Sequence, residues 1–159
     1  MKFVVHEHHA TRLHYDFRLE ISGVLKSWAI PKGPSMNPSD KRLAVMVDDH
    51  PLEYCEFEGI IPQGQYGAGP VLIWDSGEFQ SEEDSESALK KGRLSFTLKG
   101  KKLKGNFALI LIKGRGSGKD WLLIKGQDSF AQKDWGIKQE LTPAKKKKLT
   151  KKVPLCETS

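Results

Sequence analysis

The stretch His14-Tyr15-Asp16-Phe17-Arg18-Leu19-Glu20-Ile21 alternates polar and apolar residues with a period of two. Successive side chains on a β-strand point to opposite faces, so this pattern predicts a strand that is buried on one face. The apolar residues form that face, and His14, Asp16, Arg18 and Glu20 form the other. Such a strand pairs with neighbouring strands in a sheet.

The flanking sequence supplies these neighbours. Ser22-Gly23 is a turn dipeptide, so residues 24–30 complete a hairpin, and the Pro-Lys-Gly-Pro run at 31–34 ends it. Further strands are predicted over residues 42–48, 70–74, 94–98, 106–113 and 121–125. Many short strands joined by glycine-containing turns predict a mainly β protein, built as a small closed or nearly closed β-barrel.

Helical signals are few. Residues 83–91 begin with acidic side chains, end with lysines and are followed by Gly92, which is typical of a helix with a glycine C-cap. A second short helix can be drawn near Asp128–Glu140. The expected fold therefore has one or two short helices beside the barrel.

Length and composition limit the function classes. The chain has 159 residues, of which 38% are hydrophobic, and this suits one globular domain. No apolar run is long enough for a membrane span, the N-terminus lacks a signal-peptide core, and two cysteines make no disulfide framework. We expect a cytoplasmic protein without a membrane partner, with a barrel domain at 1–141 and a basic, flexible tail at 142–159.

The net charge of +6 is unevenly distributed along the chain. Residues 90–126 carry 11 basic groups and one acidic group, and residues 142–159 carry six lysines and one glutamate. Such local excesses attract phosphate backbones, so nucleic acid is the expected partner. Solvated lysines on exposed strands are the alternative for the first zone. The tail is either a nucleic-acid arm or a linker that adds only solubility.

Histidines cluster near the N-terminus, at positions 6, 8, 9 and 14. His14 and Asp16 share a strand face, and an incoming His8 would complete a set of two histidines and one carboxylate. Imidazole suits Zn, Mn or Fe, and a carboxylate shifts the preference towards harder ions such as Mn²⁺. Three protein ligands leave room for substrate. A histidine-rich polar strand edge that binds no metal is the alternative.

Two further groups could bind phosphate. Arg18 stands beside Asp16 on the same face and offers bidentate hydrogen bonds, although a surface salt bridge to Glu20 or Glu7 would also explain it. A second cluster comprises Arg42, His50 and Tyr54. Residues alone favour a core tyrosine and a turn-capping histidine there. The glycine-rich run 59–69 lacks the Lys-Ser/Thr ending of a P-loop, so it predicts a tight turn that allows close backbone approach.

Several motifs in a fixed order resemble the 3′-phosphoesterase domain of bacterial DNA ligase D. The matching stretches are HHATRLHYDFRL (8–19), WAIPKGPS (28–35), KRLAV (41–45), DHPLEY (49–54) and FEGIIPQGQYGAG (57–69). The resemblance runs from about residue 3 to residue 126. The sequence therefore looks like a stand-alone version of that domain.

The resemblance implies a small β-barrel and a Mn²⁺-dependent enzyme that heals the 3′ ends of DNA or RNA primer strands. It would remove a 3′-terminal ribonucleoside and then hydrolyse the remaining 3′-phosphate to a 3′-hydroxyl. Matched motif by motif, the metal ligands are His8, His14 and Asp16, with His9 as a competing ligand whose exclusion depends on strand register. The phosphate-contacting and catalytic positions are Arg18, Arg42, His50, Tyr54 and Lys32.

Longer members of that family carry an N-terminal extension that helps the ribonucleoside-removing step, so we expect the phosphatase step to be the stronger one here. A DNA ligase and a polymerase acting in trans are the expected protein partners. The rival interpretation is a non-catalytic barrel that binds single strands by charge and stacking, with Trp28, Trp74, Trp121 and Trp135 as platforms. A structural zinc protein is poorly supported, because the cysteines are remote from the histidines.

Overall fold

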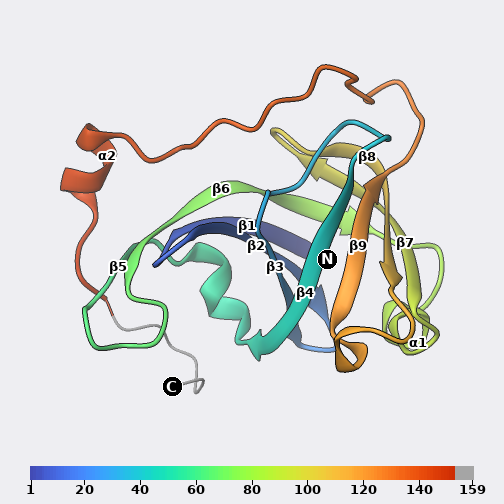
Figure 1. Cartoon of the computed structure of the whole chain (residues 1–159), viewed down its shortest axis with the longest axis horizontal. Helices are drawn as coiled ribbons and strands as arrows, with labels where there is room; N and C mark the ends of the chain where they lie inside the picture. Colours follow the sequence, from blue (N-terminus) through green and yellow to red (C-terminus); the bar gives the residue numbers. More distant parts are fainter. Residues whose placement is uncertain (153–159) are drawn as a thin grey trace.

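The computed structural model describes residues 1–152, and Figure 1 shows that strands dominate it. The strands are β1 (Lys2–His9), β2 (Leu13–Ile21), β3 (Val24–Ile30), β4 (Lys41–His50), β5 (Gly59–Ile61), β6 (Gly69–Gln80), β7 (Arg93–Gly100), β8 (Lys104–Leu111) and β9 (Asp120–Lys125). The helices are α1 (Ser85–Lys90) and α2 (Pro143–Lys148), with 3₁₀ turns η1 (Leu52–Glu56) and η2 (Gly116–Gly118). None of the helices in this described part could span a membrane.

The sheet closes on itself. Its order is β1-β2-β3-β4-β9-β8-β7-β6-β5, every pairing is antiparallel, and β1 also pairs with β6. Eight strands therefore form a barrel. The short strand β5 pairs with the start of β6, on the edge opposite to the one that pairs with β1. Closure removes the free edges that an open sheet exposes. The predicted β-barrel with two short helices is confirmed.

The alternation of polar and apolar residues in 14–21 places the core. Tyr15, Phe17, Leu19 and Ile21 are all buried against residues of the other strands. Each large apolar side chain buried in this way contributes about 1.5–3 kcal/mol. Trp28, Trp74 and Trp121 lie in the same core, so these three are not available as stacking platforms for a nucleic acid.

Two strands were not predicted, and both lack a clear pattern. In β1, Phe3, Val4 and Val5 are successive residues and all are buried, so the strand has protein on both of its faces. Alternation is the signal of a half-buried strand, so a strand covered on both faces does not show it. Strand β5 has three residues, too few for any periodicity.

The expected helix near residues 128–140 is wrong. Residues 126–142, which we call the strap, form neither helix nor strand and run along the barrel. Trp135 and Ile137 both pack on the core, and their spacing of two is that of an extended chain. Backbone carbonyls of Pro34 and Lys138 also accept hydrogen bonds from Trp135 Nε1 and Trp74 Nε1 respectively. These contacts with the barrel favour the extended form over a helix.

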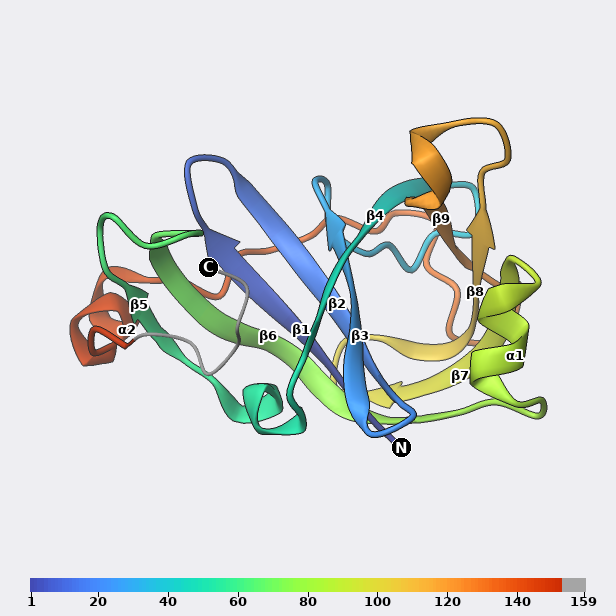
Figure 2. The same ribbon diagram turned by 90° about the horizontal axis from the view of Figure 1, so that it is seen from below.

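The chain after the strap returns to the barrel beside β5. Thr142 caps α2 by accepting a hydrogen bond from the Lys145 amide, and Lys151 then forms a parallel bridge with Ile60. Figure 2 shows α2 next to β5. Residues 153–159, which include Cys156, lie outside the described part of the chain. The division into a domain at 1–141 and a tail at 142–159 stays a prediction.

Candidate metal and phosphate site

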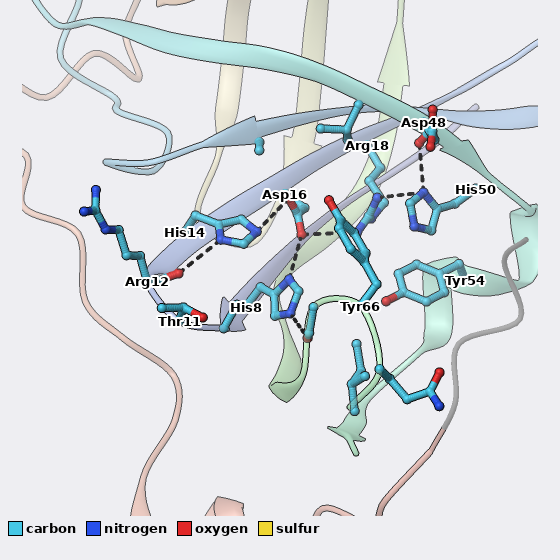
Figure 3. A pocket seen from close by; sticks show the side chains of 16 residues that line it. His8, Thr11, Arg12, His14, Asp16, Arg18, Asp48, His50, Tyr54 and Tyr66 are labelled. Atoms are coloured by element: carbon cyan, nitrogen blue, oxygen red, sulfur yellow. Dashed lines mark hydrogen bonds and ion pairs between the residues drawn. The ribbon is translucent and has the colours of Figure 1, made fainter. Parts of the chain in front are cut away.

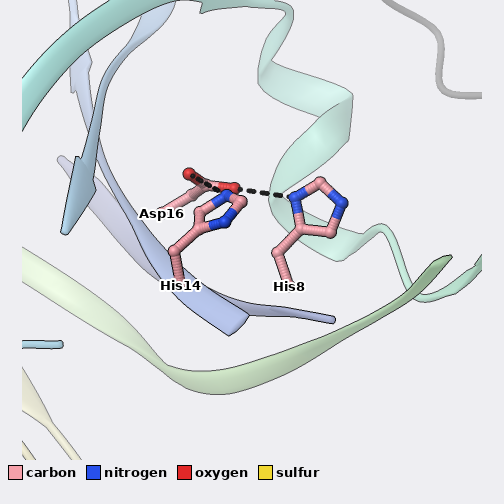
Figure 4. Close-up of side chains that lie close together, drawn as sticks. All are labelled: His8, His14 and Asp16. Atoms are coloured by element: carbon pink, nitrogen blue, oxygen red, sulfur yellow. Dashed lines mark hydrogen bonds and ion pairs between the residues drawn. The ribbon is translucent and has the colours of Figure 1, made fainter. Parts of the chain in front are cut away.

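The register between β1 and β2 brings the two histidines of the expected ligand set together. His8 pairs with His14, and His6 pairs with Asp16, so all four side chains share one face of the strand pair. The imidazole rings of His8 and His14 lie 4.7 Å apart, centre to centre. Figure 4 shows both rings turned towards the Asp16 carboxylate. His9 belongs to the opposite face.

Each histidine directs one ring nitrogen towards Asp16. Nδ1 of His8 lies 3.3 Å from Asp16 Oδ2, and Nε2 of His14 lies 3.2 Å from Asp16 Oδ1. One ligand atom from each of the three residues lies within 4.8 Å of the others. The set therefore has the composition and spacing of a site for one divalent ion.

The outer ring nitrogens support the same interpretation. His8 Nε2 lies 2.6 Å from the Gly67 carbonyl oxygen, and His14 Nδ1 lies 3.2 Å from the Arg12 carbonyl oxygen. A carbonyl only accepts, so each outer nitrogen carries a proton, and the inner nitrogen of each ring is the one that can bind a metal ion once its own proton is lost. Metal-ligating histidines are held by such outer hydrogen bonds, so these residues fit a resident metal ion.

The loop after β5 reaches His8 because Gly67 has no side chain. Gly67 has φ +72°, and a Cβ there would lie 3.0 Å from His8 Cε1. The close backbone approach predicted for the glycine-rich run is therefore present, and it places the Gly67 backbone against His8. Tyr66, beside Gly67, is 79% exposed and stands at the pocket (Figure 3).

Arg18 is the centre of a buried network. Its Nε donates to His6 Nδ1 at 3.0 Å, its Nη1 donates to Ser27 Oγ at 2.9 Å, and its Nη2 donates to Asp16 Oδ2 at 3.3 Å. The residue is only 3% exposed, so a surface salt bridge to Glu20 or Glu7 is wrong. The guanidinium also lies 4.8 Å from the centre of the Tyr54 ring. These contacts fix the direction in which the cation points.

His6 is the part of this network that sequence reasoning missed. It is completely buried, and its Nε2 donates to the Phe57 carbonyl at 3.1 Å, which leaves Nδ1 as the acceptor for Arg18. Burial and the Arg18 charge hold the pKa of His6 well below its ordinary value, so the ring is neutral and keeps that acceptor. Its position two residues before His8 was the available signal, but it required β1 to be recognised as a strand.

Opposing effects set the charges of the ligand residues. Burial alone would raise the pKa of Asp16, but the Arg18 charge and hydrogen bonds from His14 and His8 hold it well below its ordinary value. Burial lowers the pKa of His14, and the Asp16 carboxylate more than reverses this. Asp16 is therefore ionised at neutral pH and can serve as an anionic ligand.

His50 and Tyr54 come to the same pocket from the end of β4 and from η1. His50 Nδ1 lies 3.2 Å from Arg18 Nη1 and 3.0 Å from the Asp48 carbonyl oxygen. Burial and the Arg18 charge lower the pKa of His50 to about 4, so this imidazole is neutral at physiological pH. The Tyr54 ring lies 4.7 Å from the His50 ring and stacks on Phe57. Tyr54 is thus a buried residue that also lines the pocket.

The pocket has a volume of about 560 Å³ and is open to solvent (Figure 3). Six of the eight site residues expected from the sequence line it, namely His8, His14, Asp16, Arg18, His50 and Tyr54. The described part of the chain forms this pocket without Lys32 or Arg42. Ala29 of β3 pairs with Asp16 of β2 on one side and with Val45 of β4 on the other. Lys32 follows the end of β3 and Arg42 precedes Val45 on β4, so both cations lie beyond Asp16 in the direction of His14. Arg42 Nη2 contacts Asp40 there at 3.4 Å.

The fold and this site together define a closed β-barrel with a two-histidine, one-carboxylate cluster and a buried arginine in one pocket. Residues 6–111 match the family model of the DNA ligase D 3′-phosphoesterase domain, and the chain belongs to this family.

The similar proteins are multifunctional non-homologous end joining proteins LigD. The one from Pseudomonas aeruginosa is 53% identical over 132 residues, which cover 83% of this chain and 16% of the relative. Those from Mycobacterium tuberculosis and Mycolicibacterium smegmatis are each 47% identical, covering 82% and 80% of this chain and 17% of each relative. The chain thus spans about one-sixth of the length of these relatives.

Proposed function

We propose that this chain is a metal-dependent 3′-phosphoesterase that heals nucleic-acid ends for DNA repair by end joining. It hydrolyses a 3′-phosphate to a 3′-hydroxyl and removes a 3′-terminal ribonucleoside from a primer strand. The observation that carries the proposal is the convergence of His8, His14 and Asp16 on one point beside the buried Arg18, in a chain of the 3′-phosphoesterase family.

The two histidines and Asp16 would hold the ion, and Mn²⁺ is the ion we propose because the set mixes imidazole with a carboxylate. Zn²⁺ and other divalent ions are the alternatives. When bound, the ion supplies Lewis-acid polarisation of a phosphate oxygen. The Gly67 and Arg12 carbonyls keep both imidazoles in the tautomer that this role requires.

Arg18 stabilises the negative charge that develops on the phosphoryl group during hydrolysis. A guanidinium has five N–H groups, and the contacts to His6, Ser27, Asp16 and His50 engage four at most. The cation also lines the pocket, so an N–H group remains for a phosphate oxygen. Because the network holds the guanidinium before substrate arrives, little reorganisation is needed in the transition state.

His50 acts on the same phosphate or on the leaving 3′ oxygen. It is neutral in the free protein, and an arriving phosphate dianion would raise its pKa and allow it to take up and donate a proton. The adjacent Tyr54 ring keeps the imidazole in place. Lys32 and Arg42 lie outside the pocket lining, so we assign them to the strand beyond the reacting phosphate.

The proposed substrate is a primer strand paired with a template, made of DNA or RNA. Of the cationic groups in residues 90–126, Lys102, Arg115 and Lys125 pair with Glu140, Asp120 and Asp128 respectively. The remaining cations of that zone can bind the backbone without reading its sequence. A DNA ligase and a polymerase acting in trans would use the healed 3′-hydroxyl.

A labelled primer ending in a 3′-phosphate tests the proposal, incubated with Mn²⁺, Zn²⁺, Mg²⁺ or Co²⁺. We expect phosphate release and a 3′-hydroxyl product with Mn²⁺, and no release from the His14→Ala variant. A primer ending in a 3′-ribonucleotide, assayed in parallel, measures the ribonucleoside-removing step. Absence of phosphate release with every ion would refute the proposal, and a fully active His14→Ala variant would reject the ligand assignment.

A further inference from the structure

The lysine-rich end of the chain is attached to the barrel on both sides of α2. Before α2, the Glu7 carboxylate accepts hydrogen bonds from the amides of Glu140 and Leu141, at 2.6 and 2.9 Å. After α2, Ile60 donates to the Thr150 carbonyl at 2.8 Å and accepts from the Lys152 amide at 2.9 Å. The helix is therefore held in place rather than carried on a free arm.

Both attachment points belong to elements that build the pocket. Glu7 precedes the ligand His8 on β1, and Ile60 precedes Ile61, which lines the pocket. The loop that follows β5 supplies Gln65, Tyr66 and Gly67 to the pocket wall. Figure 2 shows α2 next to β5. The lysines are thus held beside a strand whose last residue and following loop line the pocket.

The charges on this segment are mostly uncompensated. Lys145 pairs with Glu140 at 2.9 Å, whereas the structure of residues 1–152 shows no carboxylate partner for Lys146, Lys147 or Lys148. Helix α2 buries no residue, so its position adds nothing to the core. Consecutive helical residues lie about 100° apart, so four lysines in a row present charge around most of the helix. Holding like charges together costs energy that a bound polyanion would offset.

We propose that residues 145–152 form a docked clamp for the phosphate backbone of the nucleic acid whose 3′ end enters the pocket. The proposal rests on the proposed function, because that function brings a polyanion to this pocket. Contact through lysine ammonium groups is independent of sequence and sensitive to salt. The clamp holds the strand, and the pocket residues carry out the chemistry.

Two variants with equal loss of charge test the position of the clamp. One is Lys146→Gln/Lys147→Gln/Lys148→Gln, and the matched control is Lys2→Gln/Lys41→Gln/Lys133→Gln, which changes three exposed lysines outside both α2 and residues 90–126. Binding of a fluorescent duplex with a recessed 3′-phosphate is measured in chelator, so that no turnover occurs. We expect the α2 triple variant to bind about 10-fold more weakly and its log K against log salt slope to fall by about 2–3. The control variant should change affinity less than 3-fold.

Gly59 allows a test of docking that leaves every charge in place. A Cβ at Gly59 would lie 2.9 Å from the Thr150 carbonyl oxygen and 3.1 Å from Lys152 Cδ, so Gly59→Val should displace the tail from β5. We expect this variant to lose about as much duplex affinity as the α2 triple variant. Gly59→Ala gives a milder version, and unfolding midpoints with hydrolysis of a 3′-phosphomononucleotide in Mn²⁺ verify that barrel and pocket are intact.

The outcomes separate the alternatives. Equal losses in the two triple variants would show that only total charge matters, and wild-type affinity in a folded Gly59→Val variant would show a floating polycation; either result overturns the clamp. Preferential binding of anionic phospholipid vesicles over the duplex would overturn it as well. Because binding is measured without turnover, an inactive wild-type protein that binds the duplex through α2 would refute the proposed function and leave the clamp standing.

Discussion

Two neighbouring residues of β1, His8 and His9, occupy opposite faces of the strand and have different surroundings. His8 lies opposite His14, and both rings face Asp16 in an open pocket. His9 contacts the carboxylate of Glu7 at 2.7 Å on the other face. Each face therefore has imidazole beside carboxylate, but only the pocket face brings two imidazoles to one carboxylate.

The carboxylates differ in what already occupies their oxygens. Glu7 is completely buried and accepts from the amides of Glu140 and Leu141 as well as from His9. Asp16 is contacted by side chains only, two of which are histidines that a metal ion could hold in the same positions. Residue type alone does not distinguish a metal site from a structural anchor, whereas the partners of each oxygen do.

The largest expected effect tests the difference between His8 and His9. His8→Ala removes one of three ligands, and we expect phosphate release from a 3′-phosphate primer in Mn²⁺ to fall more than about 1000-fold, since losing a ligand's outer partner alone costs roughly 10–100-fold. His9→Ala should keep activity within about 3-fold. Metal affinity by titration calorimetry should follow the same order. Equal losses in both variants would show that the site does not depend on the register of β1 and β2.

His8 and His9 also show which features of the site could be predicted from the sequence and which could not. Alternation in residues 14–21 predicted β2, its buried face and the shared face of His14 and Asp16, because a period of two is a local property. The choice between His8 and His9 depended on how β1 pairs with β2. Pairing is a long-range property, and β1 is buried on both faces and shows no alternation, so only the family resemblance favoured His8.

The same limit explains Arg18 and the strap. Burial of Arg18 requires His6, Ser27 and Asp16 from three strands around it, and no local pattern reports such a network. The strap is extended because Glu7, Trp74 and Pro34 bind it, and all three are distant in the sequence. Lys32 and Arg42 came from motif matching, and their roles stay predictions.

The next largest effect concerns Glu7, which lies on the face of β1 opposite the pocket. Glu7→Gln keeps the shape of the side chain but places an amide N–H₂ against backbone donors, so we expect a loss of about 2–3 kcal/mol in the free energy of unfolding, as hydrogen bonds to a charged acceptor contribute roughly 1.5–3 kcal/mol each. Urea titration measures it, and hydrogen exchange should quicken at the Glu140 and Leu141 amides. Metal affinity should stay within about 3-fold of wild type. A large loss of metal binding would show that the two faces are coupled.

A smaller effect is expected from Ser27→Ala on the pocket face. Ser27 is completely buried, and its Oγ accepts from Arg18 Nη1 at 2.9 Å. Without this acceptor the guanidinium is held less well, and we expect kcat/KM for the 3′-phosphate primer to fall about 10-fold while metal affinity is retained. Ser35→Ala is the matched control, because Ser35 is also buried and hydrogen-bonded, to Asp40. The idea fails if both variants lose activity equally.

The smallest effect is the pH dependence of stability caused by His50. Its pKa is about 4 in the folded protein, below the ordinary value of 6.5, because of burial and the Arg18 charge. Between pH 6.5 and 4, His50 therefore binds a proton in the unfolded chain but not in the folded chain. The free energy of unfolding decreases as the pH falls through this range. The group is partly solvent-screened, so the effect is about 1 kcal/mol. In metal-free urea titrations, His50→Gln should gain that amount relative to wild type between pH 7.5 and pH 4.5. An unchanged difference across this range would mean that His50 is not held neutral by Arg18.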